Sequence, residues 1–223
     1  MNRKDRYSRV IAWFEQNMPE ARTELHYHDP FQLLISVILA AQCTDKRVNL
    51  ITPSLFEAFP TPEALAVSNK DAVYEYIKSV SYPNNKARHL VEMARMLVTD
   101  YHGKVPDSIE ALMRLPGVGK KTANVIASVA FEIPALAVDT HVFRVANRIG
   151  LTDHSKTPLE TEKELTRHIP RRLWSVAHHW LILHGRYVCL ARKPKCESCG
   201  LTACCNYFTE IEDSLSRARR NHS

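Results

Sequence analysis

The chain of 223 residues contains only six glycines and no apolar run long enough to cross a bilayer. So few glycines argue against a sandwich or barrel of many short strands, because those folds need frequent tight turns. The longest apolar run, 33–41, is interrupted by Ser36. The first seven residues lead into an amphipathic segment without the apolar core of a signal peptide. No repeat or low-complexity tract is evident. These absences predict a cytoplasmic globular protein without a membrane partner.

Basic residues exceed acidic ones, with 30 Lys and Arg against 24 Asp and Glu and a pI near 9.0. This balance fits a polyanionic partner such as nucleic acid, but a generic basic protein shows the same balance. The length is sufficient to bury a substantial core as one large domain or two small ones.

Apolar residues recur at helical period along nearly the whole chain. The pattern predicts an amino-terminal helix around Trp13 and a second helix that opens at Asp29-Pro30 and buries 31–41. Further helices are predicted over 45–59, 70–80, 84–101, 107–113, 120–131, 139–149, 158–168 and 171–184. Only 136–138 shows some strand-like alternation. The fold class is therefore all-α, with its best internal boundary at 132–134, and 214–223 is expected to fray.

Four cysteines near the carboxyl end, Cys189, Cys196, Cys199 and Cys205, are separated by six, two and five residues. Thiolates so close in sequence can converge on one metal centre, and the polar stretch 192–195 between them does not suit a core. Tetrahedral zinc usually takes two Cys-x-x-Cys units, and only one is present here. The spacing favours an iron–sulfur cubane over zinc and leaves Cys204 as an alternative fourth ligand.

A glycine turn at 115–119 is followed directly by Lys120 and Lys121. Two glycines allow the backbone to approach a phosphate closely, and the following helix amino terminus attracts anions. Cations in a first helical turn oppose the helix dipole, which suggests a functional reason for them. Lys121 is either a phosphate contact or an amine nucleophile, and the turn alone favours the phosphate contact.

Asp139 stands where a capped helix begins. An N-cap aspartate holds the helix end whether or not its carboxylate also takes part in chemistry. Both roles are compatible.

Several motifs together resemble the endonuclease III family within the helix-hairpin-helix DNA glycosylase superfamily. The resemblance extends over nearly the whole length and lies in 41–45, in the hairpin with Lys121, in 137–141, in 179–186 and in the cysteine spacing. It implies two helical lobes with a DNA-binding cleft between them and a helix-hairpin-helix motif over about 108–131. One lobe is a helical barrel at 23–133, and the other joins 1–22 to 134–223.

The resemblance also implies a cofactor and a reaction. The cofactor is one [4Fe–4S] cluster on the loop 189–205, with Cys205 selected over Cys204. The reaction is that of a bifunctional DNA glycosylase and AP lyase, which removes oxidised pyrimidines from duplex DNA and nicks abasic sites. Lys121 is carried over as the nucleophile that forms a Schiff base and cleaves by β-elimination. Asp139 is carried over as the carboxylate that assists it. The partner is damaged double-stranded DNA, and a bacterial, nucleoid-associated monomer is expected.

Two residues match positions that enter the duplex in the family. Gln42 would fill the gap left by the extruded base, although alone it could be a polar helix end. Tyr82 lies in Ser81-Tyr82-Pro83, where the family usually has Gly-Leu or Gly-Phe, so strand separation and damage preference are open. The remaining predicted DNA contacts are Gly117, Val118, Gly119, Lys120, His141, Arg144, Arg192, Lys193 and Lys195.

Two other functions remain open. A monofunctional glycosylase of the same superfamily is disfavoured because such relatives generally lack a lysine at the position of Lys121. A non-catalytic iron–sulfur protein that binds DNA is disfavoured because Lys121 and Asp139 occur together.

Overall fold

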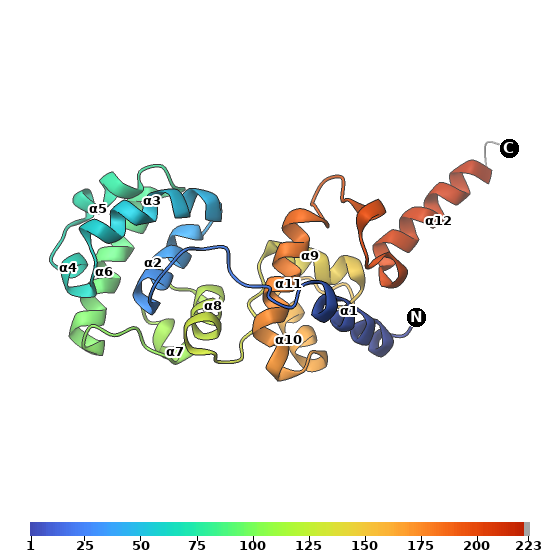
Figure 1. Cartoon of the computed structure of the whole chain (residues 1–223), viewed down its shortest axis with the longest axis horizontal. Coiled ribbons are helices and arrows are strands. Elements are labelled where there is room, and N and C mark those ends of the chain that lie inside the picture. Colours follow the sequence, from blue (N-terminus) through green and yellow to red (C-terminus); the bar gives the residue numbers. More distant parts are fainter. Residues whose placement is uncertain (221–223) are drawn as a thin grey trace. The chain divides into compact units, whose positions relative to one another are not determined.

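The computed structural model describes residues 1–220 and divides the chain into two compact units. One unit is Thr23–Ala135, and the other joins Met1–Arg22 to Leu136–Ser223. Figure 1 shows helices and connecting segments throughout, and residues 1–220 contain no strand, so the all-α prediction is confirmed. No helix in this described part is long and apolar enough to cross a membrane.

The unit Thr23–Ala135 contains seven helices. They are α2 (Pro30–Ala40), α3 (Asp45–Ala58), α4 (Pro62–Ala66), α5 (Lys70–Ile77), α6 (Pro83–Tyr101), α7 (Ile109–Leu112) and α8 (Lys120–Phe131). Most begin at a polar side chain that accepts a hydrogen bond from the first turn; Asp29 caps α2 in this way, and Thr44 caps α3. Such caps satisfy amide groups that a helix cannot pair internally.

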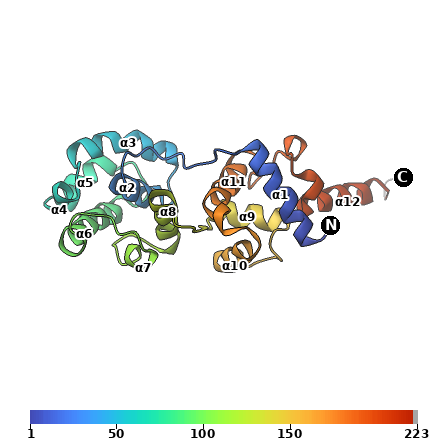
Figure 2. The same cartoon turned by 60° about the horizontal axis from the view of Figure 1, so that its bottom comes forward.

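Helix α2 forms the centre of this unit. Phe31 and every side chain from Leu33 to Leu39 are buried, and the helix packs against α3, α6 and α8. Both views show it lying among these helices (Figures 1 and 2). A helix that is apolar all round is stable only when neighbouring helices cover it, so these contacts hold α2 in place.

The other unit contains the two terminal parts of the chain. Its helices are α1 (Arg3–Asn17), α9 (Thr140–Ile149), α10 (Pro158–His168), the short turn η1 (Arg171–Leu173), α11 (Trp174–Tyr187), the short turns η2 (Cys196–Ser198) and η3 (Thr202–Cys204), and α12 (Asn206–Arg220). Helix α11 packs on α9, and α12 extends away from the other helices of its unit in both views (Figures 1 and 2).

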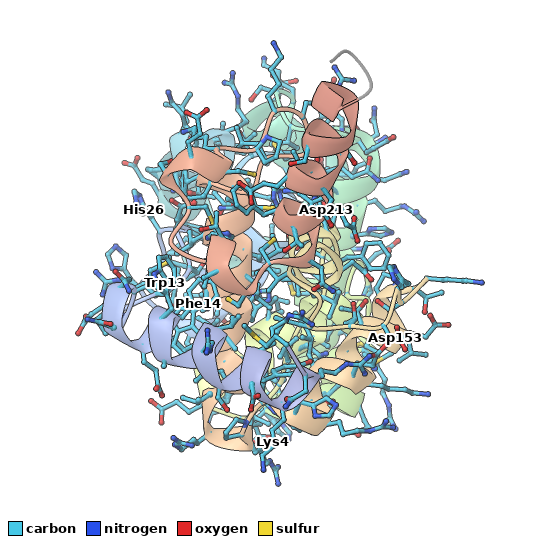
Figure 3. All side chains as sticks on the ribbon, turned by 90° about the vertical axis from the view of Figure 1, so that its right-hand side faces the viewer. Lys4, Trp13, Phe14, His26, Asp153 and Asp213 are labelled. Carbon is cyan, nitrogen blue, oxygen red and sulfur yellow. The ribbon has the colours of Figure 1, made fainter. Side chains whose placement is uncertain are left out.

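Aromatic residues of α1 join the core of this second unit. The Phe14 ring stacks on Trp180 with ring centres 5.5 Å apart, and Trp180 Nε1 donates a hydrogen bond to the Met18 carbonyl at 2.7 Å. Trp13 and Phe14 extend from one side of α1, and Lys4 extends from the opposite side (Figure 3). The amino-terminal helix is thus built into the core formed with α11.

The structure departs from the predicted elements in three places. Helix α4 was not predicted, because five residues are too few to show a periodic pattern. Helix α12 was not predicted, and it runs to Arg220 through the segment from Ser214 for which fraying is expected; 221–223 lie outside the described residues. The segment 136–138 is buried but forms no strand.

Candidate functional site

The glycine turn at 115–119 joins the short helix α7 to α8. Gly117 has φ of 81°, a left-handed conformation that favours glycine, and Gly119 is the N-cap of α8 without a side-chain cap. The Val118 side chain is only 8% exposed and its N–H donates to the Leu115 carbonyl at 3.1 Å. The Val118 side chain therefore anchors the turn, and its contact with DNA stays a prediction.

Lys120 and Lys121 occupy the first turn of α8, and both are exposed. From Ala123 to Ser128 the same helix is buried. The lysines are therefore held at the tip of a helix whose body belongs to the core. A rigid helix of this kind fixes the position of the Cα atom from which a reactive side chain extends.

Asp139 is the N-cap of α9. Its Oδ1 accepts hydrogen bonds from the His141 N–H at 2.8 Å and the Val142 N–H at 2.9 Å, so the predicted cap is confirmed. Oδ1 thus holds the start of α9, and the part that Asp139 takes in chemistry stays a prediction.

The predicted DNA contact Arg144 is extensively bonded within its own unit. Its Nη2 donates to the Gly185 carbonyl at 2.9 Å and to the Cys189 carbonyl at 3.1 Å, and it lies 3.2 Å from His141 Nδ1. Its Nε also reaches the Cys189 carbonyl. The Arg144 guanidinium therefore ties α9 to the end of α11 and orients His141, while its role in DNA binding stays a prediction.

Gln42 and Tyr82 lie in two turns of the unit Thr23–Ala135. Both have φ of 55°, which is uncommon for residues other than glycine. Gln42 is exposed, and the Tyr82 side chain is 62% exposed. Backbone strain of this kind persists only where neighbouring groups enforce it, and it is common at functional sites.

The four predicted ligand cysteines line one pocket at the carboxyl end of α11. Cys189, Cys196, Cys199 and Cys205 all border it, and residues from α9 and α12 complete its wall. Among residues 1–220, no group of three or more His, Cys, Asp and Glu side chains is arranged to hold a single metal ion. The four cysteines predicted as ligands thus share one pocket, and the kind of metal centre they hold stays a prediction.

Cys204 does not line this pocket. Its side chain is buried in the hydrophobic core, and its Sγ lies 3.3 Å from the Leu201 carbonyl. Cys205 faces the pocket, where burial raises the pKa of its thiol to about 11. Of these two adjacent cysteines, Cys204 therefore packs in the hydrophobic core and Cys205 lines the pocket.

Three groups around the pocket were not predicted. Arg148 donates to Cys189 Sγ at 3.5 Å and to the Leu190 carbonyl at 2.6 Å, and its guanidinium lies 4.5 Å from the centre of the Tyr207 ring. His184 Nε2 lies 3.7 Å from Cys199 Sγ, and burial lowers the pKa of His184 to about 4. Sequence offered one signal for His184, since it lies in the last turn of the helix that ends just before Cys189.

The third group is the Trp13 indole of α1. A Cβ atom added to Gly200 would lie 2.3 Å from Trp13 Nε1, so the chain between Cys199 and Leu201 passes directly against the indole. Only glycine allows this approach. Helix α1 therefore shapes the cysteine loop although it is distant in sequence.

The basic residues on the first part of the loop are exposed. Arg192, Lys193 and Lys195 show their side chains to solvent, and Lys193 has φ of 50°. The Lys195 N–H donates to the Val188 carbonyl at 2.9 Å, which closes the loop on the end of α11. The loop thus presents three positive charges from a backbone that is tied at its base.

Residues 35–171, more than half of the chain, match the HhH-GPD superfamily of base excision DNA repair proteins. The chain belongs to that superfamily. Its curated relatives include the endonuclease III of Rickettsia conorii, 45% identical over 92% of this chain and 97% of the relative. The endonuclease III of Escherichia coli K12 is 41% identical over 95% of this chain and 100% of the relative.

Solved structures of the superfamily agree. A trapped covalent intermediate of endonuclease III with DNA has a TM-score of 0.90 and 42% identity, and covers 95% of this chain and all of that one. A thermostable thymine-DNA glycosylase has a TM-score of 0.83 and 27% identity, over 92% of this chain and 98% of that one. The resemblance to endonuclease III is therefore confirmed. As a superfamily member the chain carries its hairpin lysines on one unit and its aspartate and cysteines on the other.

Proposed function

We propose that this protein is a bifunctional DNA glycosylase and AP lyase that removes oxidised pyrimidines from duplex DNA. The observation that carries the proposal is the exposed Lys121 in the first turn of α8, directly after the left-handed glycine turn. Its support is the similarity to an endonuclease III that was trapped as a covalent intermediate with DNA. The unit Thr23–Ala135 supplies the nucleophile, and the other unit supplies the carboxylate and the cysteine pocket.

In the proposed reaction the damaged nucleotide leaves the base stack, because its C1′ is inaccessible inside the duplex. The lone pair of uncharged Lys121 Nζ attacks C1′, and the bond from C1′ to the base breaks as the base takes up a proton. Loss of a proton from the nitrogen and opening of the sugar ring give an imine. Removal of a C2′ proton then breaks the bond from C3′ to its oxygen, and the phosphate leaves. Water releases the lysine.

Asp139 is proposed to assist this reaction with its Oδ2 atom, while Oδ1 stays on the amide groups of α9. A carboxylate stabilises positive charge that develops on the sugar and accepts the proton that the lysine must lose. The cap restrains the carboxylate, so its charge is positioned before substrate binds.

The four thiolates of Cys189, Cys196, Cys199 and Cys205 are proposed to hold one [4Fe–4S] cluster. The residues present fit that group, because all four thiols border one pocket and Cys204 is turned away from it. The cluster would supply a rigid cross-link, with no part in the bond-breaking steps. It would fix the loop that presents Arg192, Lys193 and Lys195 to phosphate.

The proposed partner is double-stranded DNA with damaged bases or abasic sites, bound by a monomer. Gln42 and Tyr82 are proposed to enter the duplex, and the exposed groups of the hairpin, Gly117, Gly119 and Lys120, to contact a phosphate. His141 and Arg144 are proposed to border the carboxylate. Sequence-independent phosphate contacts position the protein, and the damaged base sets specificity.

The test is borohydride trapping on an abasic duplex. Borohydride reduces an imine to a stable amine, so the wild-type protein is expected to form a covalent DNA adduct. Lys121→Gln removes the amine and should abolish both the adduct and strand nicking. Lys120→Gln is the matched control, because it removes the same charge one residue earlier and should retain the adduct.

Undiminished nicking by Lys121→Gln would contradict the proposed nucleophile. Base release by the wild-type protein without any adduct would indicate a monofunctional glycosylase. Intact DNA binding with neither activity would indicate a non-catalytic iron–sulfur protein.

A further inference from the structure

The turns that carry Gln42 and Tyr82 are joined by a direct hydrogen bond. The Ser81 hydroxyl donates to the Gln42 carbonyl at 2.6 Å, although the two residues lie 39 positions apart. Ser81 immediately precedes Tyr82, so the bond links the turns that carry two of this unit's left-handed residues, Gln42 and Tyr82. Glycine or alanine at position 81 could not make this bond.

A buried lysine holds the turn that carries Gln42. Lys86 is only 6% exposed, and its Nζ donates to the Leu39 carbonyl at 2.8 Å and the Ala41 carbonyl at 2.7 Å. These carbonyls end α2, where a helix leaves acceptors unpaired and carries partial negative charge. Burial lowers the pKa of Lys86, so the protein holds an ammonium group here against a desolvation cost.

Both tethers come from the start of one helix. Tyr82 is the N-cap of α6 in a left-handed conformation, whereas an N-cap is normally extended. The Lys86 N–H donates to the Tyr82 carbonyl at 3.1 Å, and its side chain holds the end of α2. One turn further, His89 supports the hairpin, since a Cβ on Gly117 would lie 3.1 Å from His89 Cβ. The first two turns of α6 thus form a common base for three exposed turns.

We propose that Ser81 and Lys86 are positioning residues that hold Gln42 and Tyr82 as a single preformed probe, which enters the duplex when the damaged nucleotide is extruded. The inference rests on the proposed function, because it assigns Gln42 and Tyr82 to DNA. A probe fixed in the free protein loses little conformational freedom when it binds. Ser81 acts on Gln42 through its backbone, and neither Ser81 nor Lys86 takes part in bond breaking.

The experiment compares two substrates under single-turnover conditions. One is a duplex with thymine glycol, where the base must be extruded. The other is a single-stranded oligonucleotide with an abasic site, where no stacked partner has to be displaced. Ser81→Ala should slow excision from the duplex about fivefold, the effect of one lost hydrogen bond, and leave nicking of the single strand within about twofold. Ser81→Thr keeps the hydroxyl and should restore the duplex rate.

Ser54→Ala is the matched control, because the exposed Ser54 hydroxyl also donates to a carbonyl, that of Ile51 at 3.1 Å, within α3 of the same unit. It should change neither rate. Lys86→Met should slow the duplex reaction more than Ser81→Ala, by about tenfold or more, because two carbonyls at the end of α2 lose their donor. If Lys86→Met does not fold, the serine variants still decide the question.

A double-mutant cycle separates positioning from a general structural role. Gln42→Ala keeps the backbone carbonyl but removes the probe side chain on which Ser81 acts, so adding Ser81→Ala should cause little further loss on the duplex. Additive losses, equal losses on both substrates, or an unchanged duplex rate in Ser81→Ala would overturn the inference and leave the proposed function standing. A wild-type protein that nicks neither substrate would overturn both.

Discussion

At the scale of single residues, Asp139 combines two roles that conservative substitutions can separate. Asp139→Asn keeps an oxygen that caps α9 and removes the charge, so we expect unchanged thermal stability and loss of most base excision and lyase activity. Asp139→Ala also removes the cap, which costs about 1 kcal/mol of unfolding free energy. Thermal melting and single-turnover excision, measured on both variants, check this prediction. An asparagine variant as active as wild type would show that Asp139 is only a cap.

The adjacent cysteines Cys204 and Cys205 provide a second test at this scale. Cys205 lines the pocket and Cys204 lies in the core, so Cys205→Ser should lose iron and the yellow-brown colour, whereas Cys204→Ser should keep both. Serine at position 204 can still donate to the Leu201 carbonyl, which favours folding of the control. Iron content per chain and the visible absorption spectrum are the measurements. A zinc-loaded, colourless wild-type protein would contradict the cluster itself.

Some residue-scale features could not be read from sequence. Gln42 and Tyr82 both have left-handed backbones, and the bonds from Ser81 to the Gln42 carbonyl and from Lys86 to the Ala41 carbonyl form only in the folded unit. The sequence likewise showed Arg144 as one more cation, but its guanidinium is bonded to the backbone carbonyls of Gly185 and Cys189. Local spacing identifies which residue types are present, whereas tertiary contacts decide what each one does.

At the scale of elements, the hairpin between α7 and α8 offers a matched pair of glycines. Gly117→Ala places a side chain on a left-handed residue next to His89, so it should lower the unfolding free energy by at least about 1 kcal/mol. Gly119 has φ of −92° and open space where a Cβ would lie. Gly119→Ala should therefore cost less than about 1 kcal/mol, as a changed N-cap residue.

If the hairpin approaches a phosphate, Gly119→Ala should still weaken DNA binding, because its methyl group occupies the space a phosphate needs. Chemical denaturation and equilibrium binding to an abasic duplex check the pair. Full affinity in a stable Gly119→Ala protein would show that DNA does not approach this turn.

Periodicity predicted most helices because most bury one apolar face. It identified α2 and α8 closely, since each has a long buried stretch and begins with a recognisable cap or glycine turn. It failed for α4, which has five residues, and for α12, whose polar sequence resembles a solvated tail. Helices that are short or exposed bury few apolar residues, so their sequences show no clear hydrophobic period.

At the scale of the whole molecule, the net charge of +6 favours binding to DNA. The strength of that binding depends on how many of the basic side chains contact phosphates. Proteins that neutralise phosphates release counterions, so binding to undamaged duplex DNA should weaken at least about tenfold between about 50 and about 200 mM salt. The slope of log K against log salt estimates how many phosphates are contacted. Changing Arg192, Lys193 and Lys195 to glutamine should reduce that slope by roughly three if all three contact phosphate.

The matched control changes Lys156, Lys163 and Arg167 to glutamine. These three cations are also exposed and belong to the same unit, so the control removes equal charge from a surface with no predicted DNA contact. Its salt slope should stay near that of wild type, because only cations at the phosphate backbone displace counterions. Equal slopes in the two triple variants would mean that net charge, rather than the cysteine loop, attracts DNA. A wild-type affinity independent of salt would contradict phosphate binding altogether.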